Sequence, residues 1–308
     1  MTGFEAAYKG RTLAGLPDEL VQAMTRHGVG SAAFALRQGD PRAIRKALQV
    51  VADETAPRSE RLEFLAVMSE VKVPGAVSAL SRAYRGIYQD DALRKAVLSA
   101  LQNYDDPAIA EVVLSVYPAL GPESLLTAQT LLASRLAWGW KWAEAISRKP
   151  SGWAAPPIKA ENVPPGIIRK LKQHRDAGLQ ALLQTIWPST GSPTTAEMEQ
   201  LIYQRAGVIR SGSGDPYQGR TLFQTTCGGC HRLFGQGAEV GPDLTVYNRA
   251  DVESMLLAIV NPSAEIREGF ENYSVETKDG RSLSGFLVEQ DNRIIVLRGL
   301  DNQNVTLT

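Results

Sequence analysis

The side chains best suited to chemistry are two cysteines and a histidine in one short stretch, Cys227-Gly228-Gly229-Cys230-His231. Two thiols at this spacing can form thioether bonds to the two vinyl groups on one edge of a haem. The residue directly after the second thiol then lies under the iron, where an imidazole nitrogen can serve as the proximal axial ligand. The motif therefore predicts one covalent haem c (iron), attached at Cys227 and Cys230 and with His231 as the metal ligand.

Three other chemistries also use paired cysteines. A structural zinc site usually needs four Cys or His ligands, but the chain has two cysteines and three histidines, with His27 and His174 far away in the sequence. A thioredoxin-like redox pair needs a βαβ context, and no such pattern surrounds this motif. A disulfide across two residues is strained. Haem attachment is the favoured interpretation, and these three are its alternatives.

The residues before the motif predict a short helix that runs from Pro216 into the cysteines. Asp215 is a good N-cap and proline is a good first helical residue. Gly219 and Phe223 are spaced i and i+4, so they share one face of that helix. A glycine inside a helix costs about 1 kcal/mol relative to alanine, so it usually marks close packing.

This arrangement resembles class I cytochrome c, whose first helix packs a glycine and an aromatic residue at this spacing against a terminal helix. The stretch Gly241-Pro242-Asp243-Leu244 resembles the loop in which a proline carbonyl accepts a hydrogen bond from the proximal imidazole and raises its basicity. By this resemblance Pro242 takes that role toward His231, Leu244 packs on the haem edge, and Arg249 reaches a haem propionate. The alternatives are a turn proline and a surface arginine.

More narrowly, residues 214–308 resemble the haem-binding domain of Planctomycetes and Verrucomicrobia, which ends large membrane-bound dehydrogenase-like proteins. The matching stretches are GDPYQGRTLFQTTCGGCHRLFGQGAEVGPDL, NPSAEI and ETKDGRSLSGFLVE. The resemblance implies electrons from an upstream dehydrogenase module or from a redox partner protein. It also implies a methionine ligand and a terminal helix beyond the last strand, so we expect a haem domain that is truncated at its C-terminus. Met255 lies in an apolar helical stripe, where core packing is expected.

Composition sets the broad class of the chain. A length of 308 residues suggests about two domains, and 44% apolar with 21% charged residues is typical of a globular protein. The formal net charge is zero, so nothing predicts binding to nucleic acid.

No apolar run is long enough for a transmembrane segment. No signal peptide opens the chain. Because c-type haem is attached outside the cytoplasm, we expect a periplasmic or cell-envelope location and an export signal upstream in a longer protein.

Residues 1–148 show a helical repeat. Pro41, Pro74 and Pro107 are 33 residues apart, and each opens a similar segment: PRAIRKALQVV, PGAVSALSRAY and PAIAEVVLSVY. Proline is favoured at the first turn of a helix, and paired helices with a fixed period of this size predict an α-solenoid. We interpret residues 1–148 as a HEAT-like helical repeat domain.

The rest of the chain divides into two expected segments. Residues 149–213 are predicted to form a helical connector and hinge, with one helix over 166–187. Its basic side chains are expected to face solvent, and docking of an acidic redox partner is the alternative. Residues 214–308 are predicted to form the haem domain. Its last third alternates apolar and polar residues around the turn Asp279-Gly280, which predicts a small antiparallel sheet appended to the haem helices. The expected fold class is mainly α: a HEAT-like solenoid, then a cytochrome c-like haem domain with a small antiparallel sheet.

Electron transfer is the favoured function, and the chain is not expected to be an enzyme on its own. A haem-based peroxidase or gas sensor is one alternative, although no distal His-Arg pair is evident from spacing. A solenoid scaffold for protein–protein interaction is another. The sequence shows no catalytic constellation outside the haem motif.

Overall fold

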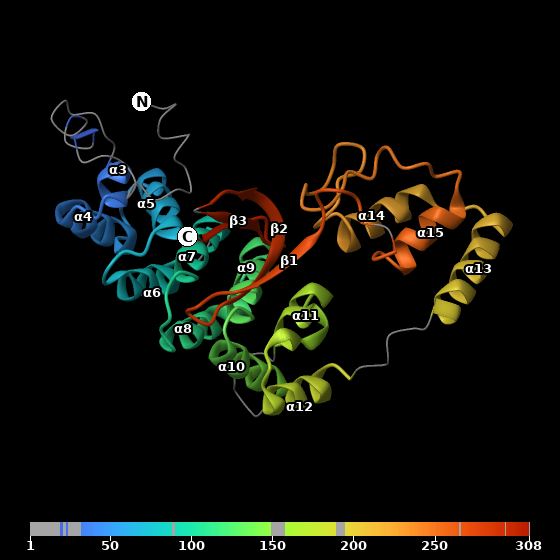
Figure 1. Ribbon diagram of the computed structural model, residues 1–308, viewed down its shortest axis with the longest axis horizontal. Coiled ribbons are helices and arrows are strands. Elements are labelled where there is room, and N and C mark those ends of the chain that lie inside the picture. The colour runs from blue at the N-terminus through green and yellow to red at the C-terminus, as the bar shows by residue number, and fades with distance from the viewer. Residues whose placement is uncertain are drawn as a thin grey trace. The chain divides into compact units, whose positions relative to one another are not determined.

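The computed structural model describes residues 19–20, 23, 32–87, 90–148, 158–188, 195–264, 266–292 and 294–307; His27 lies outside them. The described chain is mainly helical, with a small four-stranded antiparallel sheet near its C-terminal end (Figure 1). It packs into two compact units. We call Met1–Trp187 with Ser274–Thr308 the helix–sheet unit, and Pro188–Tyr273 the motif unit, because it contains the two cysteines and His231.

Stacked helices build most of the helix–sheet unit. In chain order they are α3 (Ala32–Arg37), α4 (Pro41–Ala52), α5 (Arg58–Glu70), α6 (Ala76–Gly86), α7 (Asp91–Leu101), α8 (Ala108–Val116), α9 (Pro122–Leu132), α10 (Leu136–Ser147), α11 (Pro165–Gln173) and α12 (Ala177–Ile186). Helices α4, α6, α8, α10 and α12 contact one another in that order, and α3, α5, α7 and α9 form a second series. The three repeat prolines therefore precede or open α4, α6 and α8, which lie in one layer.

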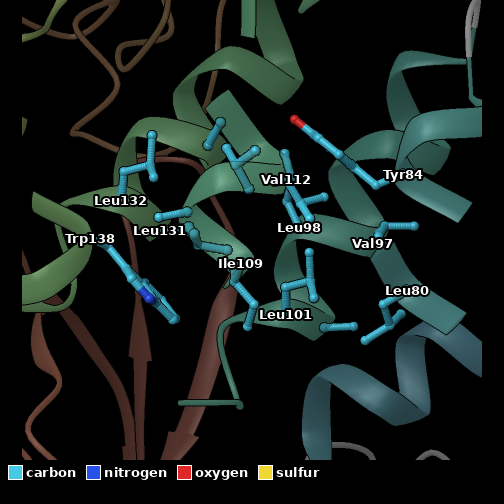
Figure 2. Close-up of a cluster of buried hydrophobic side chains, with 14 of the residues drawn as sticks. Leu80, Tyr84, Val97, Leu98, Leu101, Ile109, Val112, Leu131, Leu132 and Trp138 are labelled. Carbon is cyan, nitrogen blue, oxygen red and sulfur yellow. The ribbon is translucent and has the colours of Figure 1, made fainter. Parts of the chain in front are cut away.

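The core lies between these helices. Figure 2 shows apolar side chains of α6 to α10 gathered in one cluster. Its labelled members are Leu80, Tyr84, Val97, Leu98, Leu101, Ile109, Val112, Leu131, Leu132 and Trp138. Trp138 and Trp142 are fully buried, as expected for two tryptophans on one helical face. Because each helix buries residues against its neighbours in both series, the stack forms one continuous core.

The structure contains the predicted small antiparallel sheet. Its strands are β1 (Asn272–Glu276), β2 (Ser282–Gln290), β3 (Ile295–Arg298) and β4 (Asn304–Leu307), in the order β1-β2-β3-β4. The register of β2 with β3 shifts between Leu287 and Glu289. The first hairpin closes through the N–H of Gly280, which donates to the carbonyl of Thr277 at 2.9 Å. Gly280 has a φ of 79°, a left-handed conformation that glycine adopts without strain.

The sheet packs on the stacked helices, whereas the sequence led us to append it to the haem helices. Ser282 donates its N–H to the carbonyl of Ser134 at 2.7 Å. Arg135, which is 4% exposed, donates to the carbonyl of Asp279 at 2.7 Å. Leu297 of β3 is 2% exposed. The strands bury apolar side chains, and the first hairpin forms hydrogen bonds with Ser134 and Arg135 of the stacked helices' segment. The sheet therefore belongs to the helix–sheet unit.

The expected connector 149–213 divides between the two units. Its predicted helix over 166–187 is two helices, α11 and α12, because Asp176 accepts the N–H of Leu179 at 2.8 Å and starts a new helix. Both belong to the helix–sheet unit. Lys170 of α11 is 3% exposed and donates to the carbonyl of Thr130 at 3.1 Å. The expectation of a fully solvated basic face was therefore wrong for this lysine.

The motif unit contains three helices among its described residues: α13 (Thr195–Ser211), α14 (Pro216–Thr226) and α15 (Val252–Val260). Helix α13 packs against α15. Ala206 and Leu256 are the buried residues of these two helices, and Arg210 pairs with Glu253 across them. The end of the expected connector is thus part of the motif unit. As domain boundaries, 148/149 and 213/214 stay predictions.

Candidate functional site

Helix α14 delivers the motif, as the sequence predicted. Asp215 caps its start, because one carboxylate oxygen accepts the N–H groups of Tyr217 at 2.8 Å and Gln218 at 3.2 Å. At the other end, Cys227 donates its N–H to the carbonyl of Phe223 at 2.8 Å. The first cysteine therefore sits at the C-cap of α14, and the helix fixes where the motif begins.

The motif itself turns back tightly on its first cysteine. The N–H groups of Cys230 and His231 donate to the carbonyl of Cys227 at 3.0 and 2.9 Å. Both cysteines are free thiols and half-buried. Burial raises the pKa of the Cys230 thiol, and the charge of Cys227 acts in the same direction. Two thiols are thus held within one turn, directly before the histidine.

The imidazole of His231 is oriented by the loop that follows. Its Nδ1 lies 2.9 Å from the carbonyl oxygen of Pro242. A carbonyl only accepts, so Nδ1 carries a proton, and in the neutral imidazole the lone pair is then on Nε2. No hydrogen bond to Nε2 is found among the described residues. The ring is therefore in the tautomer that can bind a metal through Nε2.

Two glycines make room for this geometry. A Cβ on Gly241 would lie 2.7 Å from Cε1 and 2.9 Å from Nδ1 of His231, so only glycine leaves the ring its place. Gly237 has a φ of 105°, and a Cβ there would overlap the carbonyl oxygen of His231. The N–H of Gly241 also donates to the carbonyl of Cys230 at 2.7 Å. Both glycines let the chain fold back closely over the motif.

Arg249 binds the backbone of the same loop. Its guanidinium donates to the carbonyls of Leu244 at 3.0 Å, Thr245 at 3.2 Å and Tyr247 at 3.3 Å. It also lies over the ring of Phe234, 4.8 Å from the centroid. Leu244 is half-buried, and its N–H donates to the carbonyl of Arg232 at 2.8 Å. These contacts join the segment after Pro242 to the segment after His231.

The structure thus brings together Cys227, Cys230, His231 and Pro242. Sequence reasoning gave no role to Phe234 or Gly237. The signal that the sequence offered for Gly237 is the run of glycines in the loop after His231, Gly235, Gly237 and Gly241. Met255 is half-buried on α15.

The other histidine among the described residues has a structural role. His174 Nε2 lies 2.9 Å from the carbonyl of Ala133 in the helix–sheet unit. No group of three or more metal-binding side chains occurs in the part of the chain that the structure describes. A tetrahedral zinc site therefore has no ligand set there.

The residues present fit a covalently held haem. Two free thiols, an imidazole with Nε2 free, and a glycine whose missing Cβ accommodates that imidazole are what such a site needs. A comparison with protein families agrees: residues 217–294, about a quarter of the chain, match the cytochrome c family. No curated protein and no solved structure matches the chain.

The chain therefore contains a cytochrome c-like haem-binding domain. Its cofactor is a covalently attached c-type haem with iron, and its general function is haem-based electron transfer. Domains of this family typically work outside the cytoplasm. Among the described residues, no helix is long and apolar enough to cross a membrane.

Proposed function

We propose that this chain carries electrons between a dehydrogenase module, upstream or associated, and a further redox partner. The observation that carries the proposal is the hydrogen bond from His231 Nδ1 to Pro242, 2.9 Å long, directly after two free cysteines. A c-type haem supplies one iron that cycles between two oxidation states. The dehydrogenase partner is supported by the resemblance of residues 214–308 to the Planctomycete-type domain.

Each residue of the site has a proposed task. Cys227 and Cys230 hold the cofactor through thioether bonds, so that it stays bound when the partner changes. His231 is the proximal ligand through Nε2. The carbonyl of Pro242 keeps the imidazole oriented and makes it a stronger donor. Leu244 covers the haem edge and keeps water away from it.

For the helix–sheet unit we propose a HEAT-like scaffold that carries the haem domain. The support is the stacking of alternate helices in two series, with the repeat prolines at equivalent places. Solenoids of this kind commonly bind partner proteins on an extended surface. We propose a periplasmic or cell-envelope location, because c-type haem is attached there.

Attachment of haem is the decisive test. The chain is exported in cells that have a c-type haem maturation system, and the denatured protein is stained for covalently bound haem. Wild type should stain, and the double variant Cys227→Ser, Cys230→Ser should not. The matched control is Gly229→Ala, because nothing lies within 4 Å of a Cβ at that position. Stain in the double variant would refute the site.

A redox titration tests the function. The loaded protein should show one reversible one-electron transition in a potentiometric titration and negligible peroxide turnover. Peroxide turnover at the rate of a haem peroxidase would favour the enzymatic alternative instead.

A further inference from the structure

Among the described residues, the guanidinium of Arg249 donates only to backbone carbonyls. Its two Nη groups donate to three carbonyls of residues 244–247. Among the described residues it forms no ion pair with a carboxylate. A guanidinium has five N–H donors in a fixed planar fork, and three acceptors in one loop use most of them. The geometry points to a role on the protein backbone, whereas the sequence suggested a contact with a haem propionate.

The face of the guanidinium is also used. Its carbon lies 4.8 Å from the ring centroid of Phe234, within the range of a cation–π interaction. Phe234 is a non-glycine residue with a φ of 50°, and its N–H donates to Thr245 Oγ1 at 2.8 Å. A left-handed residue of this kind persists only where its surroundings hold it. Arg249 therefore contacts both segments that meet at the imidazole.

These two segments are the ones that the His231–Pro242 hydrogen bond joins. One segment is 231–234 and the other is 242–247. Besides the imidazole bond they are held by Leu244 N–H to the carbonyl of Arg232 at 2.8 Å, by Phe234 N–H to Thr245 Oγ1 at 2.8 Å, and by the contacts of Arg249. We propose that Arg249 is a positioning residue for the proximal ligand. It clamps the loop 242–247 to Phe234, and so holds the carbonyl of Pro242 against Nδ1 of His231. This inference rests on the proposed function.

The clamp requires arginine. A lysine carries its three donors on one nitrogen and cannot span three carbonyls while a planar face covers a ring. A propionate contact requires mainly a positive charge, which lysine also supplies. The substitutions Arg249→Lys and Arg249→Gln therefore separate the two roles. Arg267→Gln is the matched control, because it removes the same charge from an exposed residue of the motif unit.

The experiment uses the haem-loaded full chain. The readout is the exchange rate of the His231 Nδ1 proton with water, followed by NMR through its hyperfine-shifted resonance, together with the reduction potential. Both Arg249 variants should exchange this proton about tenfold faster than wild type. Exchange requires the loop to open locally, and the variants lack hydrogen bonds of Arg249 that oppose this opening in wild type. Arg267→Gln should exchange at the wild-type rate. The potential of both Arg249 variants should rise, since a less firmly hydrogen-bonded imidazole is a weaker donor.

Two outcomes would overturn the clamp. One is an unchanged exchange rate in both variants. The other is a wild-type exchange rate and potential for Arg249→Lys together with a changed potential for Arg249→Gln, a result that indicates a propionate contact. Phe234→Leu keeps the charge of Arg249 and removes the aromatic ring beneath it. This variant tests the clamp even if the Arg249 variants do not bind haem. Faster exchange in that variant supports the clamp, and an unchanged rate contradicts it. Absence of covalent haem in wild type would refute the proposed function, which is a different result.

Discussion

Backbone atoms of Pro242 and Gly241 place the imidazole of His231. A carbonyl orients its Nδ1, and the bare Cα of Gly241 lies against its ring. A glycine in such a place is a steric requirement, because any Cβ would enter the space of the ring. Gly219, in the middle of α14, is the opposite case, because nothing lies within 4 Å of a Cβ there.

We expect Gly241→Ala to disturb the haem site. The added methyl group would displace the imidazole and lengthen its bond to Pro242, so the loaded protein should show a mixture of spin states in its visible and EPR spectra. Gly219→Ala is the control. It should leave the spectra unchanged and stabilise α14 by up to about 1 kcal/mol, the difference in helix propensity. A wild-type spectrum for Gly241→Ala would contradict the steric argument.

Lys170 gives the helix–sheet unit a pH dependence. Burial lowers the pKa of this lysine from 10.5 to about 8, although the nearby charge of Asp301 acts in the opposite direction. Between these two values the unfolded chain binds a proton that the folded chain does not, so this group makes stability rise with pH. Burial also raises the pKa of Tyr84, which lowers stability above the ordinary tyrosine pKa.

We therefore expect Lys170→Met to change the pH profile of unfolding. The difference in unfolding free energy between wild type and variant should grow in favour of wild type from about pH 8 to about pH 10, as measured by urea titration. The contribution of Tyr84 is common to both proteins and cancels. Lys141→Met, at the surface, should keep the wild-type profile. Parallel profiles for wild type and Lys170→Met would show that the lysine titrates normally.

At the scale of elements, polar contacts recur at the spacing of the repeat. Residues about 33 positions apart are joined by side-chain contacts. The side chains pair with each other in Arg37–Glu70, Arg58–Asp90 and Asp91–Ser124, and the side-chain amides of Asn103 and Gln129 donate to the backbone carbonyls of Ser69 and Asn162. Asp91 starts α7 and also accepts the N–H groups of Glu123 and Ser124, the first turn of α9. One acidic residue thus caps the equivalent helix of the next repeat. Such directional contacts fix how the helices of one repeat align with those of the next, whereas apolar packing alone would allow several alignments.

We expect Asp91→Ala to destabilise the helix–sheet unit by about 1–2 kcal/mol, as the loss of a helix cap does. The measurement is chemical unfolding followed by circular dichroism. Glu111→Ala removes an exposed ion pair with Lys141 and should cost less than about 1 kcal/mol. Equal effects of the two substitutions would mean that Asp91 has no special role between repeats.

At the scale of the whole molecule, the motif unit is an insertion in the chain of the helix–sheet unit. The chain leaves the stacked helices after Trp187 and returns at Ser274. Ser274 accepts a hydrogen bond from Gln173 of α11 at 2.9 Å. In the returning segment, Leu283 of β2, Leu297 of β3 and Asp301 of the turn after β3 are buried, with 4%, 2% and 5% exposed. The stacked helices therefore depend on residues that follow the haem motif by many positions.

We expect a shortened chain in which a flexible Gly-Ser linker of about twelve residues replaces residues 188–273 to fold without haem. Its unfolding, followed by circular dichroism, should be cooperative and close to that of the full chain's helix–sheet unit. A chain that ends at Trp187 should be less stable, because it exposes the surface that the sheet covers. Equal stability of the two shortened chains would show that the sheet contributes nothing to the helices.

Local chemistry is what the sequence by itself determined about this protein. The spacing of Cys227, Cys230 and His231 predicts the cofactor, Asp215 and Pro216 predict the start of α14, and alternation around Asp279-Gly280 predicts the strands. In each case the signal lies within a few residues, where covalent geometry and capping act. The period of 33 residues predicts stacked helices for the same reason, since each repeat packs only on its neighbours.

Only the tertiary structure decided which surfaces these elements cover. The sheet packs on the helices, Lys170 is buried, α13 packs on α15, and Arg249 binds carbonyls of the loop after Pro242. The pattern of a strand tells which of its faces is apolar, but not which of several apolar surfaces it meets. That choice depends on contacts between residues about a hundred or more positions apart, such as Arg135 with Asp279. No local pattern encodes such a contact, because its free energy exists only once both elements have formed.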